Sequence, residues 1–321
     1  MRRIVAADIG GTHARFAIAT LDGNRVVELG EPVTLKTGDH ASFEAAWDEF
    51  GRSSERPSEL GIAFAGPVGG DVLKLTNNPW AIQPARLGEQ LGIERFTIVN
   101  DFAAVAHAVS VLDGTAFRSL WGPEGALPSE GVTTIVGPGT GLGAAALLRR
   151  RGARYEVIET EGGHIDFAPL DSLEDRILAE LRKSFGRVSV ERLVSGRGLM
   201  NIYQALGAID NRPATVRDDK ALWAAALDGS DRLAAAALDR FCLCFGAAAG
   251  DLALAQGASA VVIGGGLGFR LADHLPNSGF RDRFIAKGRF ERRMSALPVQ
   301  LITHPQPGLL GAVAAFAREH G

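Results

Sequence analysis

The sequence predicts an α/β protein of two domains. Its 321 residues allow two domains at about 100 to 200 residues each. Short apolar runs typical of strands alternate with longer segments of helical periodicity. An apolar strand followed by a turn rich in glycine and threonine occurs once in each half. This recurrence indicates two α/β units that open in the same way.

The first half begins with a predicted hairpin. Residues 4–9 are apolar and partly β-branched, stop at Gly10-Gly11-Thr12, and are followed by a second apolar run over 15–19. Further strands are predicted over 25–34, 60–65, 72–75 and 96–99. Helices are predicted over 42–50, with Ser42 as the N-cap, over 84–91 and over 101–112.

The second half repeats this opening. The β-branched run 133–136 ends at a glycine-rich turn over 137–143. Periodicity alone leaves 144–148 as strand or helix, but the turn at 149–152 and the strand-like run 155–158 favour a second hairpin. Helices are predicted over 173–183, 190–206, 220–227 and 233–256. A strand over 260–263, a strand over 299–302 and a helix after Pro307-Gly308 follow, and the sequence assigns the last two to neither unit.

Charge and cysteine content point to a small-molecule partner in the cytoplasm. The 34 Lys and Arg against 37 Asp and Glu give a net charge of -3, which supplies no field for nucleic acid or an acidic membrane. Cys242 and Cys244 face apart in a helical pattern, so we expect no disulfide and a reducing compartment. No 18 uncharged apolar residues run together, and the first apolar run is too short for secretion. We therefore expect a protein that neither spans a membrane nor is exported.

Glycine is enriched, with 40 residues or about 12% against a usual 7% or so. Glycine turns after strands indicate phosphate binding, because closely spaced backbone N–H groups bind anions that side chains would exclude. None of the turns matches a P-loop or the dinucleotide pattern. A tight hairpin with positive φ is the alternative for each one, but three together favour function. The turns are Asp8-Ile9-Gly10-Gly11-Thr12, Gly137-Pro138-Gly139-Thr140-Gly141 and Gly264-Gly265-Gly266.

Polar side chains in these turns suggest how a phosphate group would be held. Asp8, at a strand end, could hold Mg²⁺ directly or through water, or it could cap the turn. Thr12 and Thr140 could donate hydroxyl groups to phosphate oxygens, or be ordinary turn residues.

Asn100 and Asp101 lie between a predicted strand and a predicted helix. Ligands of α/β proteins bind at the carboxyl ends of strands, and an aspartate there can remove the proton of a hydroxyl during phosphoryl transfer. Helix capping is the alternative.

Glu161-Gly162-Gly163-His164 combines an acid and an imidazole, which together with Glu191 suit hydrogen bonds to a polyol. Taken alone, Glu191 reads as the surface of a helix start, and no histidine spacing here indicates a transition-metal site.

With these motifs the sequence resembles the bacterial ATP-dependent glucokinase family, within the hexokinase, acetate kinase and actin-like ATPase fold group. The resemblance covers essentially the whole chain, and the order and spacing of the motifs are more specific than any one of them. Beyond the segments already quoted, it includes Leu75-Thr76-Asn77, Asn100-Asp101-Phe102, Gly137 to Gly143 and Pro307-Gly308-Leu309-Leu310-Gly311.

The resemblance implies a two-domain hexokinase/actin-like (ribonuclease H-like) fold with an interdomain cleft. The smaller α/β domain would comprise 1–110 plus 302–321, and the larger one 111–301. The implied reaction is phosphorylation of D-glucose at its 6-hydroxyl by ATP with Mg²⁺, in a homodimer. Asp101 would be the general base. The sugar would be bound by Asn100, Asp101, Glu161, His164 and Glu191. The ATP phosphates would be bound by the turns Gly10 to Thr12 and Gly137 to Gly141. The adenosine would lie near Gly264 to Gly266.

Two departures from the pattern of this family and its relatives matter. His13 stands where asparagine commonly follows Gly-Gly-Thr, which puts any hydrogen bond from that position in question. The related group of repressors and kinases has a cysteine-rich zinc motif after its Gly-Gly-His segment, and the present sequence has none, nor DNA-reading helices before Asp8. Two alternatives stay open: a kinase for another hexose, and a non-catalytic, ATP-driven sugar sensor of the same fold.

Overall fold

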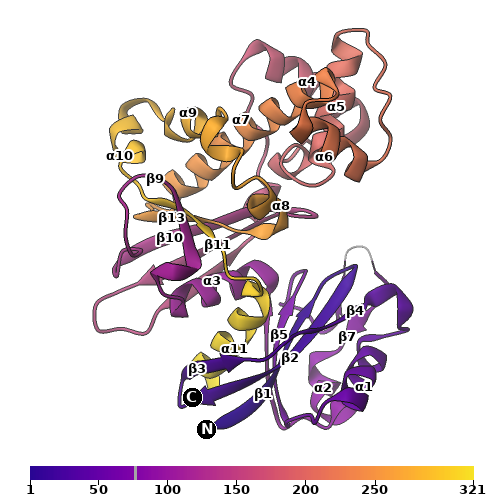
Figure 1. The fold of residues 1–321 in the computed structure, drawn as a ribbon, viewed down its shortest axis with the longest axis vertical. Helices are drawn as coiled ribbons and strands as arrows, with labels where there is room; N and C mark the ends of the chain where they lie inside the picture. The colour runs from indigo at the N-terminus through magenta and orange to yellow at the C-terminus, as the bar shows by residue number, and fades with distance from the viewer. Residues whose placement is uncertain (76–77) are drawn as a thin grey trace. The chain divides into compact units, whose positions relative to one another are not determined.

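The computed structural model describes residues 1–75 and 78–321, which form two compact units (Figure 1). Unit 1 comprises Met1–Ala116, Val157–Glu159 and His304–Gly321, and unit 2 comprises Phe117–Glu156 and Thr160–Thr303. Of the motif Leu75-Thr76-Asn77, the last two residues lie outside the described part of the chain.

Unit 1 contains a mixed sheet in the order β3-β2-β1-β5-β8, with β4 also paired to β2. The predicted hairpin is confirmed: β1 and β2 are antiparallel, while β5 and β8 run parallel to β1 on its other side. The strands are β1 (Arg2–Ile9), β2 (His13–Asp22), β3 (Arg25–Leu29), β4 (Val33–Lys36), β5 (Glu59–Phe64) and β8 (Arg95–Asn100). A separate two-stranded sheet pairs β6 (Leu73–Lys74) with β7 (Ala81–Ile82).

The single strand predicted over 25–34 is wrong, because β3 and β4 are two strands that pair with different parts of β2. Gly30 and Pro32 lie between them. Gly30 N donates to Ile18 O at 2.8 Å, and proline has no N–H to continue a ladder.

Helices cover both faces of the unit 1 sheet, as the side-chain alternation of β1 requires. Val5 and Ala7 pack in one core with Phe43 of α1, whereas Ile4 and Ala6 pack in another with Val313 of α11. Ser42 is the N-cap of α1 as predicted, its Oγ accepting from Ala45 N at 3.3 Å. The helices are α1 (Phe43–Ser53), α2 (Pro84–Leu91), α3 (Asp101–Val111) and α11 (Pro307–His320).

The contact of α11 with its neighbours depends on glycine. A Cβ on Gly311 would overlap the carbonyl oxygen of Ala104 in α3, and a Cβ on Gly61 of β5 would overlap that of Ala312. Backbone therefore meets backbone where α11 crosses α3 and β5, which fixes the helix bearing Asp101 tightly in unit 1.

Unit 2 has a sheet in the order β12-β11-β10-β13-β14-β9. The second hairpin is confirmed, with 144–148 inside a strand, and β13 and β14 lie parallel to β10. The order β12-β11-β10-β13-β14 corresponds to β3-β2-β1-β5-β8 in unit 1. In each sheet an antiparallel hairpin is followed by two strands parallel to its first strand. The strands are β9 (Phe117–Trp121), β10 (Gly131–Pro138), β11 (Leu142–Arg149), β12 (Glu156–Thr160), β13 (Ala260–Ile263) and β14 (Val299–Ile302).

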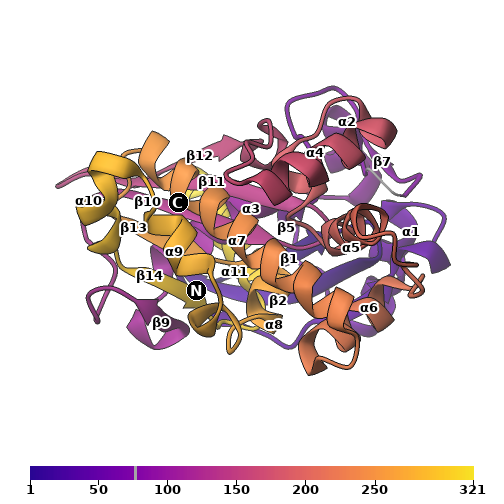
Figure 2. The ribbon, with the colours of Figure 1, turned by 90° about the horizontal axis from the view of Figure 1, so that it is seen from above.

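Helices form the rest of unit 2, and the longest, α7, packs along α9 and α5 (Figure 2). They are α4 (Ser172–Phe185), α5 (Gly198–Ile209), α6 (Asp219–Asp228), α7 (Arg232–Ala255), α8 (Gly265–Arg270), α9 (Phe280–Ile285) and α10 (Glu291–Ser295). Short 3-10 turns are η1 (Thr37–Asp39), η2 (Gly114–Ala116), η3 (Gly162–His164), η4 (Val190–Arg192), η5 (Leu275–Asn277) and η6 (Gly288–Phe290).

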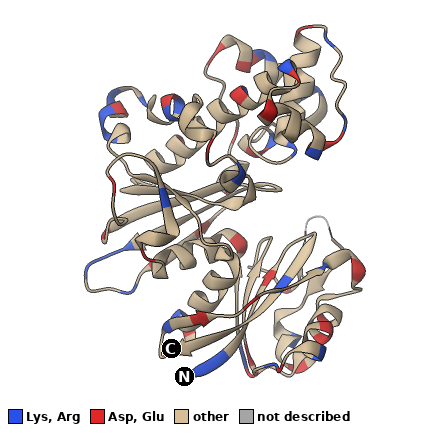
Figure 3. Cartoon of the chain, in the orientation of Figure 1, with Lys and Arg blue, Asp and Glu red and all other residues tan. Residues whose placement is uncertain are grey.

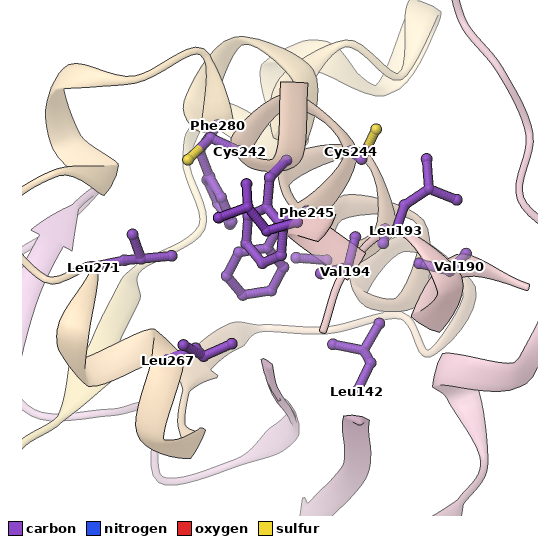
Figure 4. Packing of buried hydrophobic residues seen from close by; sticks show 14 of the residues in the cluster. Leu142, Val190, Leu193, Val194, Cys242, Cys244, Phe245, Leu267, Leu271 and Phe280 are labelled. Carbon is purple, nitrogen blue, oxygen red and sulfur yellow. The ribbon is translucent and has the colours of Figure 1, made fainter. Parts of the chain in front are cut away.

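The continuous helix predicted over 190–206 is wrong. The chain forms η4, turns, and begins α5 at Gly198, where a Cβ would overlap the carbonyl oxygen of Leu193. Val190, Leu193 and Val194 are instead fixed by burial beside Leu142 in the core of unit 2 (Figure 4).

Helix α7 is long and apolar enough to cross a membrane by length and composition, but 67% of the relevant window is buried within the fold. Cys242 and Cys244 lie on it as free, buried thiols. Burial raises the pKa of the Cys242 thiol to about 12 and that of Cys244 well above its usual range.

Candidate active site

Asp8 lies one residue before the end of β1 and faces its cross-strand partner Arg15. Arg15 Nη1 donates to Asp8 Oδ2 at 3.2 Å. Gly308, in the first turn of α11, approaches the same carboxylate so closely that a Cβ would lie 3.0 Å from Asp8 Cγ. Burial raises the pKa of the Asp8 carboxyl, and Arg15 opposes that rise. The structure thus holds one carboxylate in a confined position at the β1–β2 turn.

The turn itself is anchored through its carbonyl groups. Thr37 Oγ1 donates to Gly11 O at 2.7 Å, and Thr37 N donates to Thr12 O at 3.1 Å. Gly10 N donates to His13 O at 2.9 Å, so His13 takes part through its backbone. The side chain of Thr12 is exposed. This anchoring leaves the Thr12 hydroxyl available to a ligand.

Asn100 and Asp101 lie at the carboxyl edge of the same sheet. Asn100 caps α3: its Oδ1 accepts from Phe102 N at 2.9 Å and from Ala103 N at 3.3 Å, so capping is confirmed for this residue. Its Nδ2 donates to Gly66 O at 3.3 Å. Asp101 Oδ1 accepts from Phe102 N at 2.9 Å. Both side chains are therefore set in place by the start of the helix.

Strand register brings these two parts of unit 1 together. Ile9 pairs with Phe64, and Phe64 pairs with Asn100. Two strand spacings correspond to roughly 10 Å across the sheet. The Asp8–Thr12 turn and the Asn100–Asp101 junction hence lie at one edge, within reach of a single nucleotide-sized ligand.

Unit 2 brings Glu191 beside Glu161 and His164, which lie 30 and 27 residues earlier in the chain. His164 Nε2 lies 4.0 Å from Glu161 Oε2 and 3.9 Å from Glu191 Oε2. The Glu161 and His164 side chains are 63% and 56% exposed, whereas Glu191 is 27% exposed. Two carboxylates around one imidazole offer several acceptors and a donor to adjacent hydroxyls. Glu191 does lie at a helix start, in the first turn of the 3-10 helix η4, but its side chain is partly buried rather than exposed.

Glu191 also contacts the turn between β10 and β11. Its Oε2 accepts from Leu142 N at 3.0 Å, and a Cβ on Gly141 would overlap that same oxygen. Gly139 N donates to Gly141 O, and Gly196 N donates to Gly139 O, both at 2.8 Å. The turn is thus connected to the segment that carries Glu191.

The glycines of unit 2 are explained by backbone packing as much as by ligand access. A Cβ on Gly137 would overlap Gly264 O, and one on Gly265 would lie 2.5 Å from Pro138 O. Gly265 has a φ of 76°, which fits the positive-φ explanation, but the other turn glycines are not among those with positive φ. A Cβ on Gly139 or Gly266 would meet no atom within 4 Å, so these two leave open space for a ligand.

Sequence reasoning missed Arg15 and the Leu142 amide. Alternation along β2 could have indicated Arg15, because residues facing Asp8 follow from the register of a tight hairpin. The Leu142 contact has no local signal, since its partner Glu191 is 49 residues away. Figure 3 shows acidic and basic residues mixed over both units in this view.

The family model described as Glucokinase matches residues 5–319. A glucokinase of Zymomonas mobilis is 63% identical over 99% of this chain and 98% of its own length. The crystal structure of a glucokinase from an Antarctic psychrotroph has a TM-score of 0.85 at 33% identity, covering 99% of both chains.

A ROK family glucokinase from Streptomyces griseus, solved with glucose and AMPPNP, shares the fold with a TM-score of 0.62 at 20% identity, over 98% of this chain and 99% of its own. The expected two-domain α/β fold class of sugar kinases is thereby confirmed. Given the whole-chain match to the family model and to the Zymomonas enzyme, this chain belongs to the glucokinase family.

Proposed function

We propose that this protein transfers the γ-phosphoryl group of ATP to the 6-hydroxyl of D-glucose, giving glucose 6-phosphate and ADP. The observation that carries the proposal is the cluster in which carboxylate oxygens of Glu161 and Glu191 both lie within 4.0 Å of His164 Nε2. Membership of the glucokinase family supports the same conclusion. A site of this kind rejects sugars that lack a hydroxyl, because its polar groups would be left without partners.

Asp101 acts as the general base in this proposal. It accepts the proton of the 6-hydroxyl as the oxygen attacks phosphorus, while Asn100 beside it donates to the sugar. The support is positional: the start of α3 fixes both side chains at the carboxyl edge of the unit 1 sheet. Correct placement of the base and the acceptor hydroxyl, together with other orienting contacts, can lower the activation free energy of phosphoryl transfer by about 7 to 11 kcal/mol.

The turns at Gly10 to Thr12 and Gly137 to Gly141 hold the ATP phosphates through backbone N–H groups other than those of Gly10 and Gly139, which donate within the turns, and Gly264 to Gly266 lie near adenosine. Open space at Gly139 and Gly266 supports this. Among residues 1–75 and 78–321, no three His, Cys, Asp or Glu side chains form a metal cluster. Asp8 fits Mg²⁺ as a single protein ligand, because this ion is commonly held by one carboxylate together with phosphate oxygens and water. Mg²⁺ bound to ATP would neutralise phosphate charge.

We also infer a homodimer in the cytoplasm. The dimer rests on the resemblance to the family, and the compartment rests on two free, buried cysteines. Light scattering coupled to size exclusion, at several protein concentrations, measures the dimer directly. A monomer of 33.9 kDa at all concentrations would contradict it.

The activity is tested by ADP production from Mg-ATP with purified protein. Glucose, fructose, mannose, N-acetylglucosamine and no sugar are compared in parallel. Glucose-dependent turnover well above the others is the expected result. Greater turnover on another sugar changes the substrate, and tight ATP binding without sugar-dependent turnover contradicts the kinase.

A further inference from the structure

We propose that Glu191 is a positioning residue that connects the sugar-binding cluster of unit 2 to the turn that holds ATP phosphate. Through it, bound glucose strengthens the binding of ATP. The inference rests on the proposed function. It gives the sugar-binding side chain of Glu191 a second role, which is to make the affinity for ATP depend on whether glucose is already bound.

A single oxygen makes both contacts. Glu191 Oε2 accepts from Leu142 N at 3.0 Å and lies 3.9 Å from His164 Nε2. Leu142 immediately follows the phosphate turn, and Gly141 within the turn has no room for a Cβ because of the same carboxylate. Any shift of this oxygen toward or away from a sugar hydroxyl therefore changes the contact with the turn.

The segment that carries Glu191 holds the turn from a second point. Gly196 N donates to Gly139 O at 2.8 Å. Between the two contacts the chain is closed by backbone hydrogen bonds: Leu193 N and Val194 N both donate to Val190 O at 2.9 Å. The side chains of these residues pack beside Leu142 in the core (Figure 4). The turn and the segment 190–196 thus behave as one body, with Glu191 at its sugar-facing end.

This arrangement predicts positive coupling. Without sugar, the Glu191 carboxylate accepts from Leu142 N and lies 3.9 Å from His164 Nε2, so part of its acceptor capacity is unused and its side chain keeps some torsional freedom. Hydroxyl groups bound to it restrict that freedom, which also fixes the Leu142 N–H and the turn before ATP arrives. The second ligand then loses less conformational entropy on binding. Because such coupling is reciprocal, ATP must strengthen glucose binding by the same factor.

The first experiment uses a matched pair of glycine variants and measures glucose affinity calorimetrically without nucleotide. In Gly141→Ala the new Cβ displaces the Glu191 carboxylate, so we expect glucose to bind about 10-fold more weakly, as for loss of a charged hydrogen bond. Gly139→Ala lies in the same turn but adds a Cβ to open space, so glucose affinity should stay at the wild-type value. Equal glucose affinities in the two variants would overturn the proposal.

The second experiment measures the affinity of the non-hydrolysable analogue AMPPNP with and without saturating glucose. In the wild type, glucose should raise this affinity about 5-fold or more. Glu191→Ala should lose most of that factor, whereas Glu191→Gln should keep it, because its amide oxygen still accepts from Leu142 N. Glu161→Ala is the control, because this side chain lies near His164 and, among the described residues, has no hydrogen bond to the turn. At saturating glucose, the increase in AMPPNP affinity should therefore be the same in Glu161→Ala as in the wild type.

The outcomes separate the two ideas. A wild-type protein that binds neither glucose nor AMPPNP contradicts the proposed function itself. A wild type that binds both, with the same coupling factor retained in Glu191→Ala, contradicts only the positioning role. If Glu191→Ala does not fold, the coupling factor is measured in Gly141→Ala and Gly139→Ala instead: a factor lost in the first variant and kept in the second supports the positioning role, and equal factors contradict it.

Discussion

The β1–β2 hairpin of unit 1 and the β10–β11 hairpin of unit 2 have the same pairing but different chemistry just before the turn. In each hairpin we compare the residue pair next to the last pair before the turn. In unit 1 this pair is Asp8 opposite Arg15, and in unit 2 it is Gly137 opposite Gly143. The first pair is an ion pair at 3.2 Å, and the second has no side chains at all.

The difference follows from what packs against each hairpin. In unit 2 the carbonyl of Gly264 fills the space that a side chain on Gly137 would need. In unit 1 the corresponding carboxylate lies against Gly308, whose missing side chain leaves room for it. The same supersecondary unit therefore carries a charged group in one copy and bare backbone in the other. We interpret this as a division of labour between charge-based and backbone-based ligand contacts.

The largest expected effect tests whether the chemistry lies with the carboxylates of unit 1. Asp101→Ala should lower kcat roughly 100-fold or more, because no group remains to accept the hydroxyl proton, while glucose still binds. Steady-state kinetics and glucose calorimetry measure the two parameters. Asp113→Ala, in an exposed turn beyond the same helix, is the control and should leave kcat unchanged. A near-normal kcat in Asp101→Ala would remove this residue from the base role.

The next effect tests the binding role of unit 2. Glu161→Ala and His164→Ala should each raise the KM for glucose by about 10- to 100-fold, the loss of hydrogen bonds to charged or polar groups. Their effect on kcat should be smaller than that of Asp101→Ala. If both variants keep the wild-type KM, the sugar is bound by other residues.

A stability measurement tests why the two hairpins differ. Gly137→Ala forces a methyl group against Gly264 O, so it should lower the free energy of unfolding by about 1 to 3 kcal/mol. Gly139→Ala, two residues away in open space, should lower it by less than about 0.5 kcal/mol. Urea denaturation of both variants checks this. Equal stabilities would mean that the glycine at 137 is not required by packing.

The smallest expected effect concerns the cost of keeping Asp8 charged. Burial raises its pKa in the folded protein, so at neutral pH the ionised carboxylate is less favourable there than in the unfolded chain. Asp8→Asn should therefore be more stable than the wild type at pH 7. The gain should shrink as the pH falls through the raised pKa and vanish below about 3.9, where the carboxyl is protonated in both states. Denaturation at a series of pH values measures this difference, and a constant or opposite difference contradicts it.

Much of the fold follows from local signals. Both hairpins were predictable because β-branched runs end at glycine turns, and α1 was predictable from Ser42 and apolar spacing. The break between η4 and α5 was not, because it depends on the close approach of Leu193 and Gly198 rather than on periodicity. The residue types of the site could likewise be read from motifs, but their grouping could not. Glu191 meets Leu142 only because a 3-10 turn packs on a distant strand.

Helix α11 has a consequence for how the protein is made. It supplies Leu309, Val313 and Phe316 to the face of the unit 1 sheet that carries Ile4 and Ala6. Yet 187 residues, numbered 117 to 303, are synthesised between the two long segments of unit 1, and all of them but Val157–Glu159 belong to unit 2. At about 5 to 20 residues per second this interval lasts roughly 10 to 40 s. During that time the first strands exist without their covering helix, and unit 2, although translated later, can complete its core before unit 1.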